Sequence, residues 1–397
     1  SSYDKANGIL SFCLRISSNA RKTRMWLVWL AGQMQGESRS EFLIEEMQPS
    51  LLKSKIHQAI YNLLVWGTIQ MLLFWLNFGL VRTIKSLILN AGRLLVKKLI
   101  FIITFGLIFG CIRGMISGLM NSVFGTLIEE VLENSSLIKP NTFFNKTIIK
   151  WIIFGLVTGL ISGLAIAVAP NLNISPNFMV LTGVSSGLIS GLIGDRIEAI
   201  ETLKFSYNKF KNALIYGLFY GLMYGLLFGL TRITVFSQIA GFPLSLSEGL
   251  FFGLFFGLIF GFHSIEIENK TIPNQGIWQS AKNTIKLSVF LFLPSVVLTF
   301  LFLVIIKSNN TIELLIISLM YGLFLGFLLG ILRSGTPVIK HFTLRLVLYF
   351  NGYIPWNYAR FLDYCTERML LQRVGGRYRF IHKLLQDHFA QMEFRRD

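Results

Sequence analysis

Long apolar runs fill the middle of this chain, and they constrain its fold more than any other feature of the sequence. Each run approaches the roughly 20 apolar residues that a helix needs to cross a bilayer. Only helices and closed barrels satisfy all their backbone groups in lipid, and continuous runs lack the alternation of barrel strands. The sequence therefore predicts an all-α membrane protein with about eight spans, at residues 60–81, 99–123, 148–169, 178–194, 213–235, 247–263, 284–306 and 311–332.

The composition favours lipid as the solvent for most of the chain. Charged residues make up 14% of the 397 residues, about half the usual share of roughly 25% in soluble proteins. The net charge is +17, but the cations lie in short clusters beside the apolar runs. Such clusters fix topology and contact anionic lipid headgroups. We therefore expect a lipid bilayer as a partner, and no nucleic acid.

Glycine recurs at every fourth position in most of the apolar runs. Positions four apart share one helix face, so each series forms a flat groove in which backbones can approach closely. This pattern predicts helix packing within one chain or between copies, and we expect a homo-oligomer. A static bundle of close-packed hairpins and a pore or rearranging bundle both fit the pattern. The series are Gly106, Gly110, Gly114 and Gly118; Gly155, Gly159 and Gly163; Gly183, Gly187 and Gly191; Gly217, Gly221, Gly225 and Gly229; Gly249, Gly253, Gly257 and Gly261; and Gly322, Gly326 and Gly330.

The later spans form a repeated two-helix unit. Lys146, Lys211 and Lys282 open three successive hairpins, each with a short tip that carries few charges. The links between hairpins, 195–212 and 264–283, are polar and amphipathic, and they hold the cations Arg196, Lys204, Lys209, Lys211, Lys270 and Lys282. The positive-inside rule places these links in the cytoplasm. With eight spans, both termini are then cytoplasmic as well.

The cations between the first two spans do not fit this topology. The connection at 82–98 is strongly basic yet would lie outside. Either the 60–98 region lies along the membrane surface or the first pair of spans is misplaced.

One cation inside a predicted span is a candidate functional residue. Arg113 lies within the second span, and an intramembrane charge marks a functional site by default. Alternatively, its side chain reaches the interface through its long stem. No span carries the series of carboxylates expected of a proton-coupled transporter.

The chain ends in a polar region whose pattern predicts a winged-helix-like unit. Two short strands flank Gly375 and Gly376, which make a tight turn. The predicted order is a helix at 341–351, a helix after Pro355, strands at 371–374 and 377–381, and a helix from His382 to about Met392. The N-terminal residues 1–56 are also polar and helical in pattern, with a short strand or a turn of helix at 42–46.

Several of these polar motifs resemble the C-terminus of bacterial NACHT-type STAND NTPases. The similarity lies in residues 351–364, in Val374-Gly375-Gly376 and in the run 380–390, which has the family's Phe-x-His-x-x-Leu-x-Asp-x-Phe-Ala form. Residues 29–34 and 42–49 resemble the preceding part of the same region. The residues that match the family motif are Trp356, Gly375, Gly376, His382 and Phe389.

The resemblance implies a split domain arrangement. Residues 1–56 and 336–397 would form one cytoplasmic unit, interrupted by a membrane array at 57–335. The family's ATP machinery would lie upstream, because this chain has no phosphate-binding Gly-x-x-x-x-Gly-Lys-Ser/Thr run. We therefore assign no catalytic, cofactor-binding or metal-binding residue and expect no enzyme activity here. His382 is then a capping or core histidine, or a nucleotide-state sensor.

The sequence thus predicts a membrane-embedded effector or anchor module of a NACHT-type signalling NTPase in the bacterial inner membrane. The family's defence and stress-signalling roles imply that it rearranges or permeabilises the membrane on activation. Its partners would be lipid, its own upstream NTPase domain and further copies of itself. The alternative is a stand-alone channel or small-solute transporter.

Overall fold

The computed structural model describes residues 20–74, 196–208, 262–265, 270–306 and 311–392, with isolated helical residues at 115, 210–212, 214–215, 218 and 254. This part is mostly helical, with seven α-helices and two small antiparallel sheets. Apart from the isolated residues, the second to fifth predicted spans and most of the sixth lie outside it. So do their glycines and Arg113. The number of spans therefore stays a prediction.

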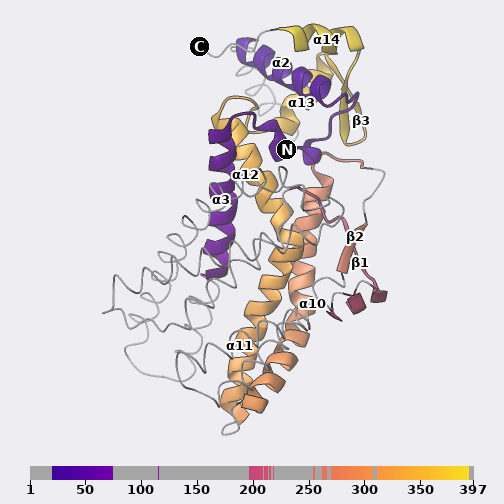
Figure 1. Ribbon diagram of the computed structural model, residues 1–397. Helices are drawn as coiled ribbons and strands as arrows, with labels where there is room; N and C mark the ends of the chain where they lie inside the picture. The colour runs from indigo at the N-terminus through magenta and orange to yellow at the C-terminus, as the bar shows by residue number, and fades with distance from the viewer. Residues whose placement is uncertain are drawn as a thin grey trace, which may run out of the picture.

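A long helical hairpin forms the apolar end of the described structure. It consists of α10 (Gln275–Ile306) and α11 (Thr311–Gly330), which contain the seventh and eighth predicted spans. Among the described residues, two helical stretches are long and apolar enough to cross a membrane, Gln275–Val304 and Leu314–Phe350. Figure 1 shows this hairpin extending away from the end that carries α2 and α14.

The two helices of this hairpin approach each other along a glycine face. A Cβ atom added to Gly326 would lie 2.9 Å from the Ser288 carbonyl oxygen, and one added to Gly330 would lie 2.8 Å from that of Thr284. At Gly322 it would lie 2.8 Å from the Val296 backbone nitrogen. These contacts leave no room for a side chain, because real Cβ atoms do not approach other heavy atoms this closely.

The second helix of the hairpin continues beyond the apolar segment without a break. A π-helical turn, η5 (Ile331–Gly335), joins α11 to α12 (Thr336–Phe350). The prediction of a separate helix that starts near His341 is therefore wrong in its start. Pro337 lies at the start of α12 and has no amide hydrogen to donate to the preceding turn. A π-bulge accommodates this loss while the helix continues.

The polar end of the molecule combines both ends of the chain. The N-terminal part contributes α2 (Ala20–Gly36), the short turns η1 (Ile44–Glu46) and η2 (Pro49–Leu51), and α3 (Lys55–Phe74). α3 contains residues 60–74 of the first predicted span and packs against α12. The C-terminal part contributes α13 (Tyr358–Glu367), β3 (Leu371–Val374), β4 (Arg377–Phe380) and α14 (Lys383–Gln391). The hairpin around Gly375 and its flanking helices lie where the sequence predicted them.

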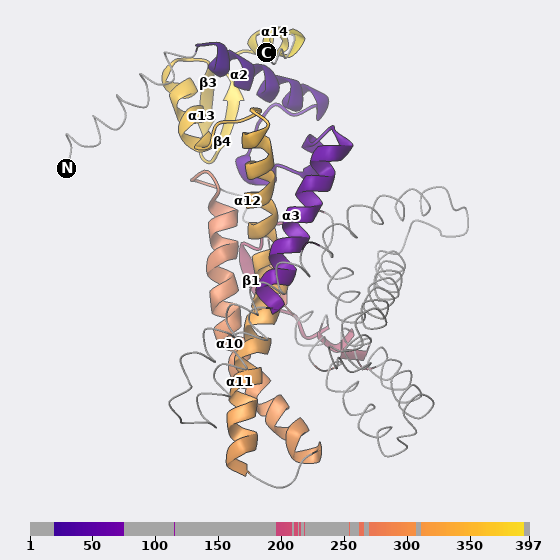
Figure 2. The same ribbon diagram turned by 90° about the vertical axis from the view of Figure 1, so that its left-hand side faces the viewer.

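One hydrophobic core joins these two parts. The rings of Trp26 and Phe361 lie 5.2 Å apart, and those of Phe42 and Tyr358 lie 5.8 Å apart. Phe42 also pairs with Tyr378 through two backbone hydrogen bonds of 2.7 and 2.9 Å, which extend the β3–β4 sheet. Figures 1 and 2 both show α2 beside α14 at this end. The sequence analysis predicted either a short strand or a turn of helix at 42–46. The segment contains both, since a strand-like bridge at Phe42 precedes the helical turn η1.

The first link forms a small sheet with residues 262–265. The prediction that the sixth span extends to 263 is therefore wrong, because Phe262 and His263 lie in a strand. β1 (Thr202–Phe205) runs antiparallel to β2 (Phe262–Ile265), with Thr202 opposite Ile265. The sequence analysis missed these strands because they are far apart in the chain, whereas the equally short β3 and β4 are joined by the Gly375-Gly376 turn. Leu203 packs against an apolar cluster formed by Leu287, Leu291, Leu325 and Leu329, so β1 lies against the α10–α11 hairpin.

Candidate functional site

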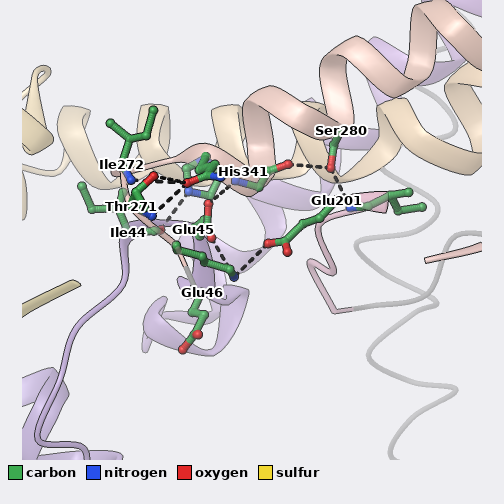
Figure 3. A network of polar contacts seen from close by, with 12 residues as sticks. Ile44, Glu45, Glu46, Glu201, Thr271, Ile272, Ser280 and His341 are labelled. Carbon is green, nitrogen blue, oxygen red and sulfur yellow. Dashed lines mark hydrogen bonds and ion pairs between the residues drawn. The ribbon is translucent and has the colours of Figure 1, made fainter. Parts of the chain in front are cut away.

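A buried ion cluster lies where three segments of the chain meet. The Lys270 Nζ atom lies 2.7 Å from Glu45 Oε1 and 2.9 Å from Glu201 Oε1. The Lys270 side chain is 4% exposed, and each glutamate side chain is 1% exposed. Glu45 belongs to the N-terminal part, whereas Glu201 and Lys270 belong to two different links. Figure 3 shows Glu45 and Glu201 converging beneath α10 and α12.

The first turn of α10 positions one of the carboxylates. Glu45 Oε2 accepts a hydrogen bond of 2.6 Å from the amide of Gly276. The amides of the first helical turn have no partner within the helix, so a carboxylate there is favourable. A Cβ atom on residue 276 would lie 2.5 Å from Glu201 Oε1 and 3.0 Å from Glu45 Oε2. Glycine at this position therefore gives both carboxylates room to reach Lys270.

The cluster keeps its central lysine charged. Burial lowers the pKa of Lys270, but hydrogen bonds and the charges of Glu45 and Glu201 outweigh this effect and raise the pKa overall. A buried ion pair is stable only when close geometry and further hydrogen bonds compensate for the lost hydration. Here the Gly276 amide supplies such a bond.

Polar side chains of α10 hold the first link beside the cluster. The amide of Ile200 donates to Ser280 Oγ at 2.6 Å. Asn283 Nδ2 donates to the carbonyl oxygens of Ile200 and Glu201 at 2.8 and 3.0 Å. Ser334 Oγ donates to the Ser280 carbonyl oxygen at 3.0 Å, which connects η5 to the same turn of α10.

Two more contacts tie the N-terminal turns to this network. The Gln48 side-chain amide makes two hydrogen bonds of 2.9 Å with the backbone of Ile197, one as donor and one as acceptor. The Nε2 atom of His341, a buried residue of α12, lies 2.9 Å from the Ile44 carbonyl oxygen and donates to it. Lys340, next to it, donates to the Arg196 carbonyl oxygen at 3.4 Å. The N-terminal part, both links, η5 and α12 therefore meet at one site.

Two residues of the family-like motif contact this network directly. The amide of Gly376 donates to the Lys270 carbonyl oxygen at 2.8 Å. Gly375 has φ +62°, a conformation that favours glycine, and a Cβ atom there would lie 2.6 Å from the same oxygen. The β3–β4 turn thus lies against the second link.

The other motif residues lie elsewhere. Trp356 is exposed, with its ring 5.4 Å from that of Tyr349. His382 is exposed at the N-cap of α14, and its side chain makes no capping hydrogen bond. Phe389 packs against Phe380 at a ring separation of 6.1 Å.

The sequence analysis did not single out the residues that form the cluster. It treated Lys270 only as one of several cations that set topology, whereas the structure buries it. The available signal was weak: Glu45 and Glu201 are two of only 20 acidic residues, and both lie in short polar segments beside apolar helices. No local spacing relates them, because they meet only through the tertiary fold.

The arrangement connects segments that are far apart in the chain. In the ranges that the structure describes, no group of three or more His, Cys, Asp or Glu residues could hold a metal ion. No family model, curated protein or solved structure matches the chain.

Proposed function

We propose that this chain is the membrane-embedded effector or anchor module of a NACHT-type signalling NTPase. The continuous helix from α11 through η5 to α12 carries this proposal. It begins in an apolar hairpin and ends in the core of the polar end of the molecule, where Leu344 and Leu348 are fully buried. We call this end, formed by α2, η1, η2 and residues 336–392, the polar unit. A helix shared by both regions transmits movement of one to the other.

The proposal includes the finer architecture expected from the sequence. The polar ends form a winged-helix-like cytoplasmic unit, and about eight spans form the membrane array. The resemblance to NACHT-type proteins and the shared core of the two chain ends support this arrangement. An upstream NTPase domain would bind ATP, respond to a stimulus and assemble copies of the protein.

In this function the ion cluster couples the polar unit to the membrane hairpins. Glu45 moves with the polar unit, while Glu201 and Lys270 lie on the links that precede and follow predicted hairpins. Close-packed interfaces switch between discrete arrangements rather than deform gradually. When the polar unit rearranges, either the links move with it or the buried ion pair breaks. Breaking the pair costs about 3–5 kcal/mol.

The test is ion leakage from liposomes that carry the full-length protein, with ATP, with a hydrolysis-blocked analogue and with no nucleotide. Leakage that depends on nucleotide supports an effector that permeabilises the membrane. A tight membrane with nucleotide-dependent assembly supports an anchor. Leakage at the same rate in all three nucleotide conditions contradicts the proposal and favours the stand-alone channel or transporter.

A further inference from the structure

A pair of exposed lysines lies at the polar end of an apolar helix face. From the structure we infer that Lys282 and Lys286 of α10 bind the phosphate groups of anionic phospholipids. This inference rests on the membrane location in the proposed function. It adds a specific headgroup site on the surface where the polar unit meets the bilayer.

The outer face of α10 changes character within one turn. Apart from Lys286, its exposed residues from Ile285 onward are apolar, and most recur at a spacing of four, with exposed fractions of 67% for Ile285, 70% for Val289 and 66% for Leu293. The stripe continues through Val297, Leu301 and Val304. Such a continuous exposed face is unfavourable in water and suits lipid tails. The first turn of the stripe therefore marks the edge of the hydrocarbon layer.

The two lysines lie at this edge. Lys282 and Lys286 are four residues apart, which places them on the same side of the helix, and both are exposed. Within the described residues neither one has an ion-pair partner, in contrast to Lys270 with its two carboxylates. Trp278, one turn further toward the polar unit, is 68% exposed. Lysine and tryptophan together are typical of a membrane interface.

Charge and position both favour a lipid phosphate as the ligand. Lysine binds phosphate as a point charge, and its long apolar stem can lie along the edge of the hydrocarbon layer. A third exposed cation, Lys204, lies on β1, which packs against α10. A soluble acidic partner would not need the adjoining apolar stripe, whereas a phospholipid satisfies both parts of this face.

The experiment is a thermal-unfolding titration of the full-length protein in a neutral detergent with dioctanoyl phosphatidylglycerol. The unfolding midpoint should rise with this lipid but not with dioctanoyl phosphatidylcholine. Each lysine should contribute roughly fivefold to the affinity for the lipid. K282Q/K286Q should therefore need about 25-fold more lipid for the same rise in the unfolding midpoint. The matched control K22Q/K383Q removes two exposed lysines on α2 and α14 and should titrate like the wild type.

Two further arms separate the explanations. Glycerol 1-phosphate in solution should not raise the midpoint, and an equal rise would overturn the assignment to lipid. Flotation with phosphatidylcholine vesicles tests membrane insertion, which requires only the apolar helices. A protein that floats but shows the same titration in wild type and K282Q/K286Q overturns the lysine site alone. A wild-type protein that does not float overturns the membrane location and this inference together.

Discussion

At the scale of single residues, Lys270 is the side chain whose replacement has the clearest consequence. Lys270→Met keeps a similar volume but leaves the Glu45 and Glu201 carboxylates close together in a buried site. Removal of one partner from a buried ion cluster costs about 3–5 kcal/mol. We expect a correspondingly lower unfolding midpoint in detergent. Lys383→Met, at an exposed position, should cost less than about 0.5 kcal/mol. Equal effects of the two substitutions would contradict a stabilising cluster.

The same lysine predicts how stability responds to alkaline pH. Because the pKa of Lys270 is raised in the folded protein, its contribution is fully present below the pKa of the unfolded chain, about 10.4. The contribution is lost only as the pH rises further, toward the folded pKa. The difference in unfolding midpoint between wild type and Lys270→Met should therefore not decline from about pH 7 to 10. A difference that vanishes by about pH 8 would show that the lysine is not held in this cluster.

At the scale of elements, the contact between α10 and α11 depends on glycine. Gly326→Leu would push a side chain into the backbone around Ser288 and Phe292. Such overpacking costs about 1–3 kcal/mol, or separates the two helices. We expect a lower unfolding midpoint, whereas Phe327→Leu, one position further along and 44% exposed, should have little effect. Tolerance of leucine at position 326 would mean that the helices are not in close contact there.

At the scale of the whole molecule, the polar unit should unfold as one body because both chain ends share its core. The amides of Phe42 and Tyr378 are bonded to each other's carbonyl groups, and the Gly376 amide is bonded to Lys270. Residues of one cooperative unit open together. Lys270→Met should therefore speed hydrogen exchange at all three amides by a similar factor. Faster exchange at Gly376 alone would show that the two ends open separately.

How much could be foreseen from sequence differs between the parts of this molecule. The apolar runs at 284–306 and 311–332 predicted two helices because backbone groups in such runs must bond within their own segment. The Gly375-Gly376 turn was predictable because its positive φ at Gly375 favours glycine. The continuous helix from α11 to α12 was not predictable from the sequence, because proline usually interrupts a helix. Here a π-bulge lets the helix continue past Pro337.

Within the described residues, the sequence by itself determined that the apolar runs at 284–306 and 311–332 are helical and where the C-terminal hairpin turns. Those properties follow from run length, periodicity and the conformational freedom of glycine, all of which act over a few residues. Only the tertiary structure decided that Lys270 is buried between Glu45 and Glu201, and that β1 pairs with β2. These partners are far apart in the chain. Their meeting depends on how the helices pack, because no local pattern specifies a partner at that separation.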